Sequence, residues 1–186
     1  MVSRKLGGAV VALVCALAAA GCGGSSGSSS SGVSAGNYVK AICSAVGPFE
    51  KDVAARSNAL NSAKLTSPQQ GKKAVQGFLN SVSTDTNQAL TRLQAAGSPA
   101  VDNGQKISTT IVTAFKDLKQ AIGSASDQAK SLSTSSPQSF KNGANKLGET
   151  VRSSLSGISS SLGKLQSADL AKAAQKEPAC TSLSGT

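Results

Sequence analysis

The chain has no histidine and no tryptophan among its 186 residues, and aromatic residues make up only 3% of it. Without histidine, a serine or cysteine nucleophile lacks its usual general base, and a catalytic zinc site lacks its main ligand. The nine acidic residues are scattered and never approach the spacing of a calcium-binding loop. A Gly-rich phosphate-binding motif is also missing from the sequence. We therefore expect no enzymatic activity, no cofactor and no bound metal.

The chain also lacks an apolar run long enough to span a bilayer comfortably. Its longest apolar stretch, Leu6–Ala20, has 15 residues, whereas a transmembrane helix needs about 20. A short basic segment, Met1–Lys5, precedes this stretch, and small residues follow it. This order is typical of a secretory signal peptide. We interpret residues 1–21 as a signal peptide.

The residues around the expected cleavage site are Ala19-Ala20-Gly21-Cys22, which resemble the lipobox of bacterial lipoproteins. In that family, small residues precede a cysteine that receives a diacylglyceryl group and becomes the new N-terminus. The resemblance implies that Cys22 is lipidated and holds the protein at the extracytoplasmic face of the cell membrane. Two acyl chains are enough for stable anchoring. Ala19 stands where the family usually has leucine, and ordinary signal cleavage beside an incidental cysteine is the alternative.

A stretch rich in glycine and serine follows the proposed lipidation site. Residues 23–36 read GGSSGSSSSGVSAG, with one valine and no charge. Such a composition is typical of a flexible linker, with a root-mean-square span of roughly 20 Å and a stretched limit near about 50 Å. We expect residues 22–36 to tether a folded domain, residues 37–186, close to the membrane.

From Asn37 onwards, apolar residues recur at helical spacing and no alternating strand pattern competes. Three Ser-Pro pairs mark expected helix starts, because serine caps a helix and proline fits its first turn. The pattern predicts an all-α fold, in which four long helices with short connections form an up-down-up-down four-helix bundle. A short C-terminal helix that Pro178 ends completes the domain. The five expected helices cover residues 37–63, 67–96, 98–132, 136–166 and 167–175.

Four cysteines are present, of which Cys15 lies in the signal peptide and Cys22 is the proposed lipidation site. The remaining two, Cys43 and Cys180, form an even pair in an oxidising compartment, where a disulfide is expected. In an up-down order the fourth helix ends beside the start of the first. The C-terminal tail can then reach Cys43 without rearrangement, so we predict a Cys43–Cys180 disulfide.

Two short stretches of the folded part resemble a group of small secreted helical lipoproteins of actinobacteria. They are Asn37–Cys43, directly after the linker, and Pro178-Ala179-Cys180 near the C-terminus. The group is largely uncharacterised, so the resemblance implies a location and a helical fold and little about activity.

The four phenylalanines fall one in each long helix. With a rise of about 1.5 Å per residue, Phe49, Phe78 and Phe115 come to a similar height in an up-down bundle, whereas Phe140 stays near one end. We expect the first three rings to form one aromatic layer.

The charge balance bears on possible partners. The formal net charge is +10, or +8 once Arg4 and Lys5 leave with the signal peptide, and the basic residues never form a run of five. Such a surface either keeps the domain soluble or attracts an anionic partner. Nucleic acid is not expected for an exported protein. We expect a non-enzymatic interaction or structural module that meets an envelope protein or an anionic cell-wall polymer. The alternative is a carrier or sensor that binds a lipid or small apolar ligand between its helices.

Overall fold

The structure, a computed structural model, describes residues 32–162 and 164–181. These residues form helices and contain no strand, so the predicted all-α fold class is confirmed. The signal peptide, Cys22 and the linker up to residue 31 lie outside the described residues. The helices are α1 (Ala35–Ser62), α2 (Pro68–Ala95), α3 (Gly104–Lys130), α4 (Pro137–Leu162), α5 (Ala168–Lys176) and α6 (Pro178–Thr181).

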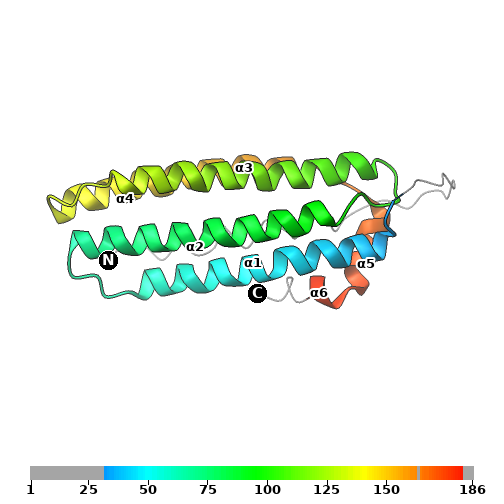
Figure 1. Ribbon diagram of the computed structural model, residues 1–186, viewed down its shortest axis with the longest axis horizontal. Coiled ribbons are helices and arrows are strands. Elements are labelled where there is room, and N and C mark those ends of the chain that lie inside the picture. Colours follow the sequence, from blue (N-terminus) through cyan, green and yellow to red (C-terminus); the bar gives the residue numbers. More distant parts are fainter. Residues whose placement is uncertain (1–31, 163, 182–186) are drawn as a thin grey trace.

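Four long helices lie side by side along the molecule (Figure 1). Each packs on the next in sequence, α2 also touches α4, and the short helices α5 and α6 pack on α1. The α1–α2 and α3–α4 connections lie at one end of the molecule, which we call the far end. The α2–α3 connection, the start of α1 and the two short helices lie at the other end, which we call the disulfide end.

Two of the Ser-Pro pairs start helices as the sequence predicts. The Ser67 hydroxyl oxygen accepts a hydrogen bond from Gln70 N at 3.3 Å, and the Ser136 hydroxyl accepts one from Ser139 N at 3.1 Å. Each cap satisfies a backbone N–H that the first helical turn would leave unpaired. The fifth helix also lies where it is expected, but Pro178 begins the short helix α6 as well as following α5.

The third Ser-Pro pair does not start a helix, and this expectation is wrong. Pro99 instead forms an isolated parallel bridge with Val33, and α3 begins only at Gly104. The chain leaves α2 through Gly97 at a φ of 72°, and it enters α3 through Asn103 at a φ of 58°. Both are left-handed conformations that glycine and asparagine tolerate best. The sequence pattern did not reveal the bridge because Val33 lies far from Pro99 in the chain.

The same bridge alters the C-terminal end of the expected linker. Val33 N donates to Ser98 O at 2.8 Å, and Ala100 N donates to Val33 O at 2.7 Å. Ser34 then caps α1, which begins at Ala35, two residues before the expected start. Residues 32–36 therefore belong to the folded part of the chain.

Buried apolar side chains fall into three clusters along the long axis. The central cluster joins α1, α2 and α3, with Leu155 and Leu162 of α4 at its margin. A second cluster fills the disulfide end, and a third fills the far end. Among the described side chains of α4, Leu147 alone is buried. The fourth helix therefore contributes least to the core.

The aromatic layer forms only in part. The rings of Phe49 and Phe115 meet edge to face, with centroids 5.8 Å apart. Phe78 packs where the central cluster meets that of the far end, which places it beyond the pair, towards the far end. Phe140 lies at the far end as expected, against Gly71, where an added Cβ would come within 2.6 Å of the ring.

Candidate functional site

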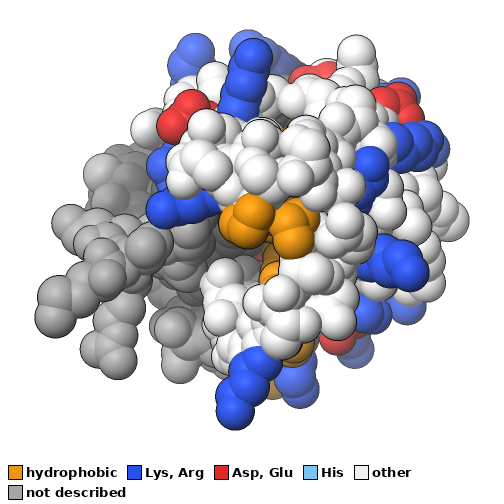
Figure 2. Space-filling model, turned by 90° about the vertical axis from the view of Figure 1, so that its left-hand side faces the viewer, with side chains coloured by type: hydrophobic (Ala, Val, Ile, Leu, Met, Phe, Trp, Pro, Cys, Tyr) orange, Lys and Arg blue, Asp and Glu red, His pale blue; other side chains and the backbone are white. Residues whose placement is uncertain are grey.

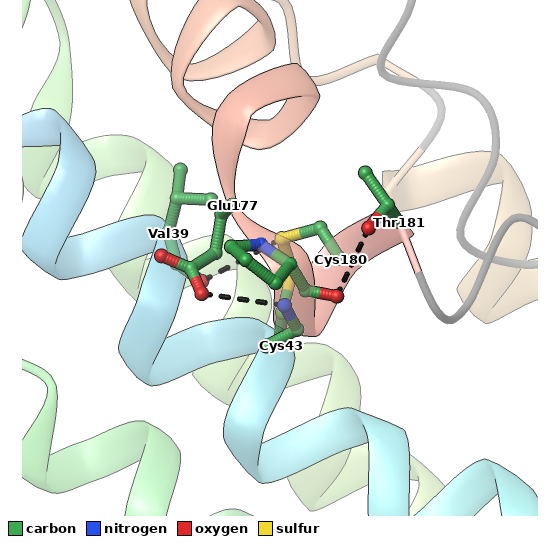
Figure 3. Close-up of a disulfide and its surroundings, with 7 residues drawn as sticks. Val39, Cys43, Glu177, Cys180 and Thr181 are labelled. Carbon is green, nitrogen blue, oxygen red and sulfur yellow. Dashed lines mark hydrogen bonds between the residues drawn. A yellow bond between two sulfur atoms is a disulfide. The ribbon is translucent and has the colours of Figure 1, made fainter.

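The structure brings together the two cysteines that the sequence pairs. Cys43 of α1 and Cys180 of α6 have their sulfur atoms 2.02 Å apart and their Cα atoms 5.1 Å apart, which is the geometry of a disulfide. Figure 3 shows the bond between α1 and the final short helix. Both cysteines are buried. The bond therefore fastens the C-terminal segment to the start of the folded domain, 137 residues earlier in the sequence.

The last helix is held in place next to this bond by Glu177. Its carboxylate accepts a hydrogen bond from Ala179 N at 3.3 Å, and its carbonyl accepts one from Cys180 N at 2.9 Å. Figure 3 shows Glu177 turned back over the backbone of α6. A helix of four residues cannot form alone, so these bonds and the disulfide together determine its position.

Tyr38 lies deepest in the disulfide end, with 2% of its surface exposed. Burial raises the pKa of its hydroxyl above 10, while a hydrogen bond with Ser108 opposes that rise. Ser108 in turn donates to Gly97 O at 2.7 Å, at the left-handed turn after α2. Tyr38 thus connects α1 to the start of α3. The buried hydroxyl groups of Tyr38 and Ser108 therefore have hydrogen-bond partners within the fold, and their role is structural.

A cleft of about 670 Å³ runs between α3 and α4. Seven of its 13 lining residues are serine or threonine, and none is aromatic. Several of these hydroxyls, including those of Thr110 and Thr150, donate to the carbonyl four residues earlier in their own helix. The cleft is open to solvent, and its lining residues are mostly small or hydroxyl-bearing rather than large and apolar. It differs from the enclosed apolar cavity that a carrier of apolar ligands requires.

The carboxyl of Glu50 on α1 has a large pKa shift. Glu50 comes four residues after Val46 and three before Val53, so the three share one face of the helix. Both valines belong to the central core cluster. Burial beside them raises the pKa of Glu50 from 4.5 to about 7. Glu50 was not predicted as a site residue, although a carboxylate within an apolar stripe can be recognised in the sequence.

Replacing Glu50 by glutamine is expected to change how stability depends on pH. In the unfolded chain the carboxyl titrates near pH 4.5, and in the folded domain near pH 7. Between these values the folded state binds more protons than the unfolded state, so the free energy of unfolding falls as the pH rises. Glu50→Gln should remove this fall and stabilise the domain by roughly 1–2 kcal/mol at pH 8, since one pKa unit corresponds to about 1.4 kcal/mol and Glu50 is only half buried.

Urea unfolding at several pH values measures this effect. The matched control is Asp52→Asn, which removes an exposed carboxyl from the same helix and so shows whether the loss of any acidic group on α1 has the same effect. Identical profiles for wild type and Glu50→Gln would contradict the assignment.

No cluster of metal-ligating side chains occurs in the part of the chain that the structure describes. Nor does any helix within those residues combine the length and hydropathy needed to cross a bilayer. In comparisons with known proteins, no family model, no curated protein and no solved structure shows a significant match to this chain.

Proposed function

We propose that this protein is a lipid-anchored, non-enzymatic interaction module of the cell envelope. The observation that carries the proposal is the buried Cys43–Cys180 disulfide, because such bonds persist in oxidising compartments outside the cytosol. It agrees with the export signal in residues 1–21 and with the lipobox-like sequence that ends at Cys22. In this proposal lipid on Cys22 holds the domain at the extracytoplasmic face of the membrane.

The proposed module is an up-down-up-down bundle of α1–α4 that α5 and α6 close at one end. The packing of each long helix on the next supports this order, as do short connections of five to eight residues between them. The disulfide end then faces the linker and the membrane. The far end points away from the membrane and is free to meet a partner.

An interaction module has more support than a carrier of apolar ligands. The core is divided into three packed clusters, and the cleft between α3 and α4 is open and rich in hydroxyl groups. Carriers usually enclose most of an apolar ligand within a pocket. Native mass spectrometry tests the alternative, since a lipid bound in stoichiometric amount would favour the carrier.

Replacing Cys22 by serine is expected to release the protein from the membrane fraction into the medium, because serine lacks the thiol that accepts the lipid. Cell fractionation and labelling with a radioactive fatty acid measure the outcome. Cys15→Ser is the matched control, since Cys15 lies inside the signal peptide and should not affect anchoring. Retention of the Cys22→Ser protein on membranes would refute the anchor.

A further inference from the structure

Positive charge is concentrated at the far end of the molecule. Residues 57–78 and 120–147, which make up this end, hold six lysines and a single acidic residue, a net charge of +5. The rest of the described chain holds 11 basic and 8 acidic residues, a net charge of only +3. This unequal distribution of charge is not visible in the sequence, because the lysines come from separate segments that only the fold brings together.

Contacts across the far end confirm that these segments meet. Lys72 Nζ donates to Leu132 O at 3.1 Å, which joins the start of α2 to the α3–α4 connection. Gln69 reaches Thr134 O in the same connection, at 3.5 Å. Figure 2 looks at this end and shows Lys and Arg side chains on several sides of it, around a hollow in which hydrophobic side chains are visible.

Four of the six lysines are available to a ligand. Lys72 is partly buried and bonded to the backbone, and Lys130 pairs with Asp127 at 2.7 Å. The other four are exposed, and no ion pair or hydrogen bond to their ammonium groups occurs within the described residues. They are Lys64, Lys73, Lys141 and Lys146.

We propose that the far end binds a flexible linear polyanion through Lys64, Lys73, Lys141 and Lys146. The proposal rests on the role of the protein as an interaction module and names the surface and the partner class. Lysine ammonium groups act as compact point charges for phosphate or carboxylate groups. Unpaired positive charge on a surface attracts an anionic chain over about one Debye length, which is about 8 Å in physiological salt.

The spread of the four lysines along the bundle axis favours a polymer over an anionic membrane. Lys64 lies in the α1–α2 connection, at the tip of the far end, whereas Lys146 lies nine residues into α4. At a rise of about 1.5 Å per residue, Lys146 is about 14 Å further from the tip. A flat bilayer surface cannot reach both without a gap wider than the Debye length. A flexible chain can follow the side of the bundle from one lysine to the next.

Binding of long-chain inorganic polyphosphate to the full mature chain tests this surface. The far-end variant carries Lys→Gln at residues 64, 73, 141 and 146. The control variant carries Lys→Gln at residues 40, 106, 172 and 176, which are exposed and lie at the disulfide end. Both variants lose four positive charges, so net charge alone affects them equally.

We expect the affinity of the wild type to fall by about 50-fold between roughly 50 and 200 mM salt, as four neutralised anionic groups imply. The far-end variant should lose about tenfold or more in affinity and most of its salt dependence, whereas the control should lose less than about threefold. A Lys→Arg version of the far-end variant should retain binding, which separates loss of charge from loss of fold.

Equal losses of affinity in the two Gln variants would overturn the proposal, as would failure of the wild type to bind polyphosphate. Binding to phosphatidylglycerol vesicles without binding to polyphosphate would assign the surface to a membrane instead. This assay does not depend on lipid at Cys22, so its failure and the failure of the anchor can be told apart.

Discussion

Loss of the Cys43–Cys180 disulfide is expected to lower the free energy of unfolding by about 4–5 kcal/mol. The bond closes a loop across a sequence separation of 137 residues, and the chain-entropy model assigns such a loop about 5 kcal/mol at 25 °C. Domains of this size are usually stable by only about 5–15 kcal/mol. Reduction should therefore leave the domain close to its unfolding threshold.

Urea unfolding followed by far-UV circular dichroism, with and without reductant, measures this loss. A double variant, Cys43→Ala with Cys180→Ala, should match the reduced wild type and should not respond to reductant. That variant serves as the control for side effects of the reducing agent. A change below about 1 kcal/mol would contradict a stabilising role for the bond.

Truncation of Phe115 to alanine is expected to cost about 3–5 kcal/mol. Phe115 is buried at 7% exposure in the central cluster, where its ring meets that of Phe49 at 5.8 Å. The substitution removes a large side chain from a cluster that joins three helices and leaves a cavity in a closely packed interior. Edge-to-face ring pairs add about 0.5–1.5 kcal/mol beyond burial, and this contribution is lost as well.

Chemical denaturation of the purified variant measures this cost. Leu65→Ala is a matched control, since Leu65 lies in the α1–α2 connection with 43% of its surface exposed. The control should change stability by less than about 0.5 kcal/mol. Phe115→Leu should fall between the two. Equal stability of Phe115→Ala and Leu65→Ala would show that the central cluster does not hold the helices together.

The sequence predicts well those elements that local signals specify. Capping serines followed by proline start α2 and α4, and the apolar periodicity outlines all four long helices. Each of these signals acts within a few residues, through a side-chain cap or a shared helix face. The Cys43–Cys180 pair was also predictable, because only two cysteines remain once Cys15 and Cys22 are assigned.

Errors arise where contacts distant in sequence override a local signal. Ser98-Pro99 has the same form as the two pairs that start helices, yet Pro99 pairs with Val33 and α3 starts five residues later. Gly104 packs against the Pro99 carbonyl so closely that there is no room for a Cβ. This approach requires glycine at the helix start. The composition of the linker likewise gave no sign that its last residues would join the fold.

The candidate surfaces could not be predicted because they are properties of the assembled helices. The lysines of the far end stand apart in the sequence, and their concentration depends on which helix ends meet. The rise of an ideal helix correctly predicts that Phe49 and Phe115 lie at a similar height, but it places Phe78 too close to them. An error of one or two turns is enough to move a side chain from one core cluster to the next, since a turn rises about 5.4 Å.

The bridge between Val33 and the α2–α3 connection is the first part of the domain to carry a force applied to the preceding chain. A pull on the chain before Gly32 first loads the two backbone hydrogen bonds of Val33 and then the first turns of α1. At Cys43 the covalent bond to Cys180 divides the load between α1 and the C-terminal helix. Only the part of α1 before Cys43, about two turns, can be pulled out before the force reaches the loop that this bond closes.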